Sequence, residues 1–206
     1  RLIGELVESV RVACADGSAR DVPRDETDFG YDRSRLQKTG DILQLLQRGS
    51  LDAALLALPV ADADVEIEIL FNEPFVVALP SQHKLAGRKE ISLGDLRGSE
   101  LLLLEDGHCL REHALEVCAL AGAHERVDFH ATSMETLRQM VAAEVGITLM
   151  PLLAVKPPIA KTSNLVIRPF SGSAPFRTIA LVWRNTSALG PFLRELAVNF
   201  RQLPKG

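Results

Sequence analysis

Cysteine, tryptophan and tyrosine are scarce in this sequence. Its 206 residues include three cysteines, one tryptophan and one tyrosine. Three cysteines in a chain of this length do not form a disulfide framework of the kind that staples small secreted domains. Cys14, Cys109 and Cys118 are therefore interpreted as either inert core thiols or redox-active thiols. No Cys/His group has the spacing of zinc ligands, so we expect no metal and no cofactor.

Long apolar runs and an excess of basic residues are also missing. No run approaches the ~18–20 residues that cross a membrane, and no signal-peptide pattern is recognised. The net charge is −4 and the pI is about 5.8, whereas a DNA-binding domain usually carries a basic face. We therefore expect a soluble, cytoplasmic chain that binds no membrane and does not bind DNA by itself. With 47% apolar residues it can build a core without staples.

Apolar runs of strand length alternate with segments of helical periodicity, which indicates an α/β fold with parallel sheets. Helices are predicted at 41–49, 92–96, 110–121, 132–144 and 191–200, and strands at 51–58, 67–71, 75–79, 101–104, 127–130, 147–150 and 178–183. The continuous apolar run at 51–58 predicts a strand buried on both faces, as in a parallel sheet. Residues 1–38 show no clear period.

Four residues are expected to mark the ends of these helices. Gly49 is expected to cap the first helix. In Thr132-Ser-Met-Glu135, Thr132 is expected to cap the next-to-last helix and Glu135 to reach back to the cap. Gly146 is expected to end that helix.

The segment from Leu101 to Cys118 places one cysteine at the start of a helix and another within it. Cys109 follows a buried strand and a turn at Gly107, and a helix N-terminus favours the thiolate. Arg111 and His108 add positive or donor character nearby. Cys118 falls on the apolar stripe of the helix, with Leu110, Ala114, Val117 and Ala121. Both cysteines could also be plain structural residues.

The spacing of the two cysteines has a geometric consequence. Nine positions along a helix span ~13.5 Å. A disulfide needs Cα atoms ~4.4–6.8 Å apart. Cys109 and Cys118 therefore cannot bond while the helix stands, and bonding would require it to unwind.

The string Gly107-His-Cys-Leu-Arg111, followed by Cys118, resembles the redox segment of the OxyR family of LysR-type transcription activators. The segments 131–143 and 146–151 also match that family, and 47–52 and 72–75 are similar to LysR effector domains in general. The resemblance covers about residues 39–200. It implies a periplasmic-binding-protein-like fold of two Rossmann-like subdomains with two crossovers. The expected subdomains are 1–72 plus 178–206, and 73–177 with the cysteines. The N-terminal winged-helix DNA-binding domain is expected to be absent from this chain.

The resemblance also assigns roles to residues. Hydrogen peroxide would oxidise Cys109 to a sulfenic acid, and Cys118 would resolve it to a disulfide. The helix would refold and change a homodimer or homotetramer, and with it the transcription of antioxidant genes. Gly107, His108 and Leu110 would line the peroxide pocket, as would Thr39 and Arg177. Phe129 and Ala143 would lie at the dimer interface. DNA would be bound through the missing domain, and a glutaredoxin- or thioredoxin-like thiol would restore the dithiol.

Plainer interpretations stay open. Arg177 could form a surface salt bridge, His108 could bond a loop carbonyl, and Thr39 could cap a helix. Residues 1–38 depart from the family pattern, and a second pocket threonine would fall near Val10, where none stands. Cys14 is assigned no role. We do not expect an enzyme, since the chain has no Cys-x-x-Cys or peroxidase motif. A thiol peroxidase with sustained turnover is a second hypothesis, because it would share the first step, the oxidation of a cysteine by peroxide. A third hypothesis is a LysR effector domain that binds a metabolite between its subdomains.

Overall fold

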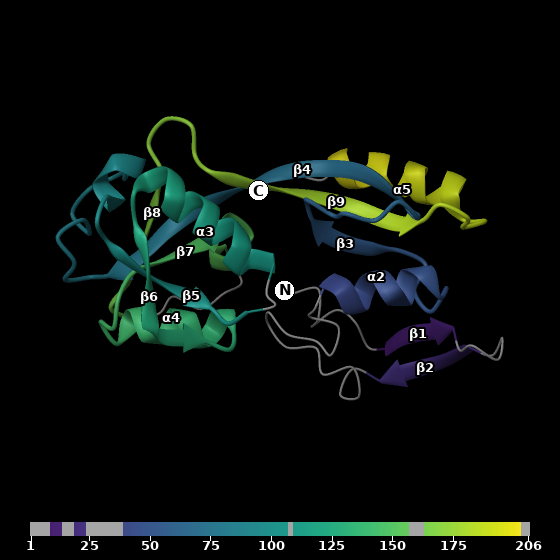
Figure 1. The fold of residues 1–206 in the computed structure, drawn as a ribbon, viewed down its shortest axis with the longest axis horizontal. Coiled ribbons are helices and arrows are strands. Elements are labelled where there is room, and N and C mark those ends of the chain that lie inside the picture. Colours follow the sequence, from purple (N-terminus) through teal and green to yellow (C-terminus); the bar gives the residue numbers. More distant parts are fainter. Residues whose placement is uncertain (1–8, 14–18, 24–38, 107–108, 157–162, 203–206) are drawn as a thin grey trace. The chain divides into compact units, whose positions relative to one another are not determined.

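The computed structural model describes residues 9–13, 19–23, 39–106, 109–156 and 163–202. The side chains before Ile42 and the side chain of Cys109 are not among those described. The chain divides into two compact units (Figure 1). One contains Glu73–Phe176, and the other contains the described residues of Ile3–Asn72 and Arg177–Gly206.

The unit Glu73–Phe176 is built around a parallel β/α arrangement. Its elements are β5 (Glu100–Leu104), α3 (Cys109–Ala121), β6 (His124–Ala131), α4 (Met134–Ala142) and β7 (Thr148–Pro151). β5 pairs in parallel with β6, and Leu101 forms a parallel bridge with Ile147 on its other side. The two crossovers therefore run in opposite directions from β5 and β6, and right-handed crossovers place α3 and α4 on opposite faces. Figure 1 shows this arrangement, and both helices pack against β5 and β6.

Antiparallel strands complete this unit. β4 (Val65–Pro80) pairs with β7 and with β8 (Leu165–Pro169), both antiparallel. Two 3-10 helices, η1 (Leu93–Leu96) and η2 (Leu152–Val155), lie in the connections. β4 is one strand where the sequence predicted two, at 67–71 and 75–79. Pro74 does not interrupt it, because the fixed φ of proline is compatible with extended backbone.

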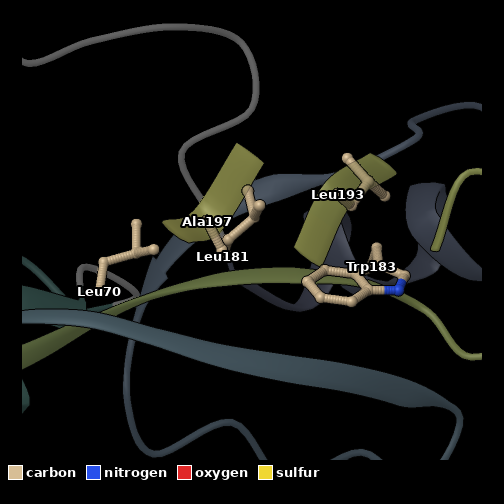
Figure 2. Close-up of a cluster of buried hydrophobic side chains, with 5 residues drawn as sticks. All are labelled: Leu70, Leu181, Trp183, Leu193 and Ala197. Carbon is tan, nitrogen blue, oxygen red and sulfur yellow. The ribbon is translucent and has the colours of Figure 1, made fainter. Parts of the chain in front are cut away.

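The other unit packs two helices against β9 (Phe176–Arg184), which pairs antiparallel with β3 (Ala54–Ala57). Side chains alternate across a strand, so odd and even residues of β9 face different helices. One buried cluster joins α5 (Gly190–Gln202) to β9 and β4, as Figure 2 shows, and it consists of Leu70, Leu181, Trp183, Leu193 and Ala197. The second joins α2 (Thr39–Gln47) to β3 and β9, and it consists of Leu46, Leu56, Ala180 and Val182. β9 is therefore covered on both faces.

The prediction for residues 51–58 was wrong in three respects. The strand covers only Ala54–Ala57 and it pairs antiparallel, not parallel. Leu55 is 53% exposed, so the strand is not buried along its whole length. An apolar run shows that a segment is hydrophobic. It does not show how many faces of the strand are covered, because that depends on elements far away in the sequence.

The N-terminal stretch contains two strands that the sequence did not predict. β1 (Ser9–Ala13) and β2 (Ala19–Pro23) pair antiparallel, with Val10 opposite Val22. The alternation of Val10 and Val12 with Arg11 is the local signal for β1. The Asp- and Arg-rich residues around these strands obscured it.

The C-terminal cap of α2 agrees with the sequence-based prediction, whereas the N-terminal cap of α4 does not. Gly49 follows α2 with a φ of +72°, as the predicted glycine cap requires. The cap of α4, however, is Ser133 and not Thr132: the backbone N–H of Thr136 donates to Ser133 Oγ at 3.1 Å. Glu135 accepts hydrogen bonds from Arg138 and Gln139 and does not reach back.

The end of α4 also differs from the prediction. The helix ends at Ala142, and Glu144 takes the left-handed conformation with a φ of +63°. Gly146 has a packing role instead, because a Cβ placed there would lie 3.1 Å from Cγ of the buried Leu102.

Candidate functional site

Helix α3 carries both cysteines of the predicted redox segment. Buried strand β5 leads through a short connection to Cys109, the first residue of α3. Gly107 and His108 lie outside the described residues. The position of Cys109 at the N-terminus of a 13-residue helix is the place where the helix dipole favours a thiolate.

Cys118 lies on the buried face of α3, as the sequence predicted. The whole predicted stripe is buried, and it consists of Leu110, Ala114, Val117, Cys118 and Ala121. The side chain of Cys118 is 3% exposed and carries a free thiol. Burial raises the pKa of this thiol to about 11, and the negative charge of Glu125 adds to the rise. Cys118 is therefore a protonated, unreactive thiol in this conformation.

The two cysteines cannot form a disulfide in this conformation. Both belong to one unbroken α-helix and are nine residues apart. Such a separation corresponds to about 13.5 Å along the axis, well beyond the ~4.4–6.8 Å between Cα atoms that a disulfide allows. Any bond between them requires α3 to unwind.

Arg111, in the first turn of α3, ties the helix to its neighbours. Its two terminal nitrogens donate to the two carboxylate oxygens of Glu125 on β6, with Nη2 2.9 Å from Oε2. Nε donates to Asp106 Oδ1 at 2.8 Å, and Nη1 donates to the carbonyl oxygen of Leu104 at 3.2 Å. Each side chain of the Arg111–Glu125 pair is about 15% exposed or less. The N-terminal turn of α3 is thus held to the ends of β5 and β6.

The electrostatics of this pair follow from its hydrogen bonds. The hydrogen bonds from Arg111 lower the pKa of the Glu125 carboxyl, and the same bonds raise the pKa of the guanidinium. His130 Nε2 lies 3.0 Å from Oε1 of Glu125 and contributes to the lowering. Both partners are therefore charged over a wide pH range.

Sequence reasoning noted Arg111 only as a positive charge near Cys109 and did not find Glu125 or His113. Glu125 lies 14 positions after Arg111, on the far side of a helix and a turn, so local spacing gives no signal. His113 offers a weak one: it lies four positions after Cys109, hence on the same helical face, and it is only 8% exposed.

The remaining predicted residues are spread over the fold. Thr39 is the first residue of α2, and its side chain lies outside the described set. Arg177 is half-buried on β9. Phe129 on β6 is 41% exposed, with the guanidinium of Arg126 5.0 Å from its ring centroid. Ala143 is the exposed C-cap of α4.

The described part of the chain contains neither a cluster of metal ligands nor a helix that could cross a membrane. Within those residues, no group of three or more His, Cys, Asp or Glu side chains is arranged to hold a metal ion. No helix among them is long and apolar enough to cross a membrane.

Comparison with known proteins places the chain. Residues 33–203 match the family described as LysR substrate binding domain. The chain is 46% identical, over 165 residues, to the DNA-binding transcriptional dual regulator OxyR of Escherichia coli. That alignment covers 80% of this chain and 53% of the relative, so the chain spans about half the length of the curated relatives it matches.

Solved structures agree with the sequence comparison. The crystal structure of the reduced form of OxyR matches with a TM-score of 0.70 and 40% identity, covering 80% of this chain and 76% of that one. The oxidised form of OxyR matches with a TM-score of 0.68 and 43% identity, covering 80% and 77%. The fold is thus the periplasmic-binding-protein-like fold that the resemblance implied. The chain belongs to the LysR substrate-binding domain family and, within it, to the OxyR regulatory domains.

Proposed function

We propose that this chain is the hydrogen-peroxide-sensing regulatory domain of a LysR-type transcription activator, and that Cys109 and Cys118 form its thiol switch. The observation that carries the proposal is the placement of both cysteines on α3, one at the N-terminus and the other buried nine residues later. Relatives of 39–46% identity are named hydrogen peroxide-inducible genes activators or probable ones, which supports the same stimulus.

The chemistry has two balanced steps. In the first, the thiolate sulfur of Cys109 attacks one oxygen of hydrogen peroxide, and the O–O bond breaks. Cys109 becomes a sulfenic acid, and the other oxygen leaves as hydroxide and takes up a proton to become water. In the second, the sulfur of Cys118 attacks the sulfenic sulfur, so the S–O bond breaks and a disulfide forms. The leaving oxygen departs as a second water, carrying the proton from the Cys118 thiol.

Burial of Cys118 gives the switch its coupling to conformation. While α3 is intact, Cys118 is protonated and far from Cys109, so the second step waits for the helix to unwind. Unwinding exposes apolar side chains of the α3 stripe and changes the surface of the unit. The chemical signal thereby becomes a structural one.

The peroxide pocket is proposed to be lined by Gly107, His108 and Leu110, together with Thr39 and Arg177. Thr39 would orient the peroxide and Arg177 would keep the Cys109 thiolate ionised, as in the family that the sequence resembles. Leu110 is buried at the start of α3, which gives such a pocket an apolar wall. No cofactor is needed for either step, and the chain is not proposed to be an enzyme, because its sequence has no Cys-x-x-Cys or peroxidase motif.

The output is proposed to be a changed homodimer or homotetramer. Phe129 is 41% exposed and Val127, two residues earlier on β6, is 70% exposed, so both present apolar surface to solvent. With Ala143 this surface suits a contact with a second copy. DNA binding would belong to an N-terminal winged-helix domain, a cytoplasmic thiol of the glutaredoxin or thioredoxin kind would reduce the disulfide, and antioxidant genes would be the targets.

The test is disulfide mapping by mass spectrometry before and after about one equivalent of hydrogen peroxide. We expect a new peptide link between Cys109 and Cys118, with Cys14 unchanged. Two free thiols after peroxide treatment would overturn the proposal, and a thermal shift with small metabolites that needs no thiol would then favour a metabolite-binding effector domain. Sustained consumption of peroxide with a thiol reductant would instead indicate a peroxidase.

A further inference from the structure

One ion pair connects the redox helix to the strand beside it. Arg111 lies two residues after Cys109 in the first turn of α3, and Glu125 is the second residue of β6. The guanidinium meets the carboxylate with two hydrogen bonds. This geometry fixes both the position and the rotation of the first turn of α3 relative to the strand.

We propose that Glu125 is a positioning residue of the thiol switch: by holding Arg111, it keeps the helix between the two cysteines folded in the dithiol form and so sets how readily the disulfide forms. This inference rests on the proposed function. It goes further in assigning control of the switch to a residue outside the redox segment.

The burial of the pair is what makes it strong enough for this role. The side chains of Arg111 and Glu125 are 14% and 15% exposed, whereas Asp106, the other acidic partner, is 97% exposed. Exposed ion pairs are screened by water and contribute little. A bidentate pair that is largely shielded from water contributes more, and removing one partner leaves the other charge poorly solvated. Glu125, not Asp106, is therefore the anchor.

The position of Arg111 in the chain couples the pair to oxidation. Arg111 lies between Cys109 and Cys118, so it is part of the segment that must unwind before they can bond. Unwinding the first turn of α3 draws the guanidinium away from Glu125 on β6, a strand held by its own pairing with β5. The pair therefore stabilises the dithiol form and not the disulfide form.

Glu125 also affects the reactivity of the second cysteine. The pKa of Cys118 is raised first by burial and then by the negative charge of Glu125. A carboxylate at this place therefore suppresses the Cys118 thiolate, which is the attacking group in disulfide formation. Loss of the charge would ease ionisation of Cys118 and so speed its attack, whereas the position of the thiol–disulfide equilibrium would respond to the loosening of the helix.

The experiment measures the thiol–disulfide equilibrium of the full 206-residue chain in glutathione buffers. The reaction is the dithiol plus one oxidised glutathione giving the intramolecular disulfide plus two reduced glutathiones, and it is read by alkylation and mass spectrometry. For Glu125→Gln we expect the equilibrium constant for disulfide formation to rise about tenfold, within the range seen when contacting charged partners are uncoupled. The matched control is Glu66→Gln, which removes the carboxylate paired with Arg194 at 2.6 Å in the other unit, and it should leave the constant within about twofold.

The equilibrium separates a positioning role from a merely structural one. A pair that stabilises both redox forms equally lowers the stability of both forms in the variant and leaves the equilibrium constant unchanged. An unchanged or lowered constant in Glu125→Gln, with wild type forming the disulfide, would overturn this inference alone. Failure of the wild type to form any disulfide would overturn the proposed function.

A second variant keeps the inference testable if Glu125→Gln does not fold. If Glu125→Gln shows no cooperative thermal transition as the dithiol, Glu125→Asp is used, because it keeps the charge but shortens the reach by one methylene. We expect a smaller rise in the constant, of about threefold, since the bidentate contact weakens while the carboxylate remains. No rise in this variant overturns the inference.

Discussion

Cys109 and Cys118 are residues of one unbroken α-helix, and no disulfide can join them until that helix unwinds. This relationship distinguishes a redox switch from a structural disulfide, because a structural disulfide joins residues that the fold already brings together. Here the fold keeps the two thiols apart and gives them different environments. Cys109 is at a helix N-terminus, and Cys118 is buried with a raised pKa.

Replacing Cys109 with serine should abolish the response to peroxide without loss of the fold. Serine is close in size to cysteine, and the helix start needs no thiol to form. We expect the thermal midpoint of Cys109→Ser to stay within a few degrees of wild type, as for substitutions within about 0.5 kcal/mol. Peroxide should then produce no change in amide hydrogen exchange of α3. A variant in which peroxide still raised exchange in α3 would show that another group senses it.

Cys118 should resist alkylation in the native dithiol protein. With a pKa of about 11, roughly one thiol in a thousand is ionised at pH 8, and burial blocks access to that fraction as well. We expect iodoacetamide to label Cys109 first and Cys118 only after addition of denaturant, as read by peptide mass spectrometry. Equal labelling rates for the two thiols in native buffer would contradict the assigned environments.

The Arg111–Glu125 pair should make stability depend on pH in the acid range. The pKa of Glu125 is lowered in the folded protein, so its contribution is fully present above the ordinary value of 4.5 and is lost as pH falls through the folded pKa. At pH 7, Glu125→Gln should lower the free energy of unfolding of the dithiol form by about 1–3 kcal/mol, as for a lost hydrogen bond to a charged group. The difference from wild type should shrink below pH 4.5 in denaturant titrations. A difference that stayed constant down to pH 3 would argue against an ionic contribution.

The observed N-cap of α4, Ser133, is the residue directly after the predicted one, Thr132. Ser133 Oγ accepts the backbone N–H of Thr136, whereas Thr132 is exposed. We expect Ser133→Ala to lower the free energy of unfolding by about 1 kcal/mol, the usual cost of losing a cap. Thr132→Ala serves as the control and should change it by less than about 0.5 kcal/mol. The reverse order in urea denaturation would restore the sequence-based assignment.

The local sequence pattern predicted the structure correctly where burial of one face of an element, or one residue at its end, was sufficient to specify it. The five-residue stripe of α3 is buried as its helical spacing predicted, and Gly49 takes the positive φ of a helix cap. Local pattern failed where competing residues were adjacent, as at Thr132 and Ser133. It also failed where burial depended on a distant layer, as at Leu55. Two adjacent hydroxyl residues can both cap a helix, and only the packing of the helix chooses between them.

The amino-acid sequence by itself predicted the helix that contains Cys109 and Cys118 and the impossibility of a disulfide within that helix. These conclusions need only the spacing of Cys109 and Cys118 and the rise of an α-helix, both of which are local. The tertiary structure alone decided that Arg111 contacts Glu125 and that the charge of this carboxylate raises the pKa of Cys118. Those contacts arise because β6 returns in parallel beside β5 after the crossover of α3, and the register of such a return is fixed by packing and not by spacing along the chain.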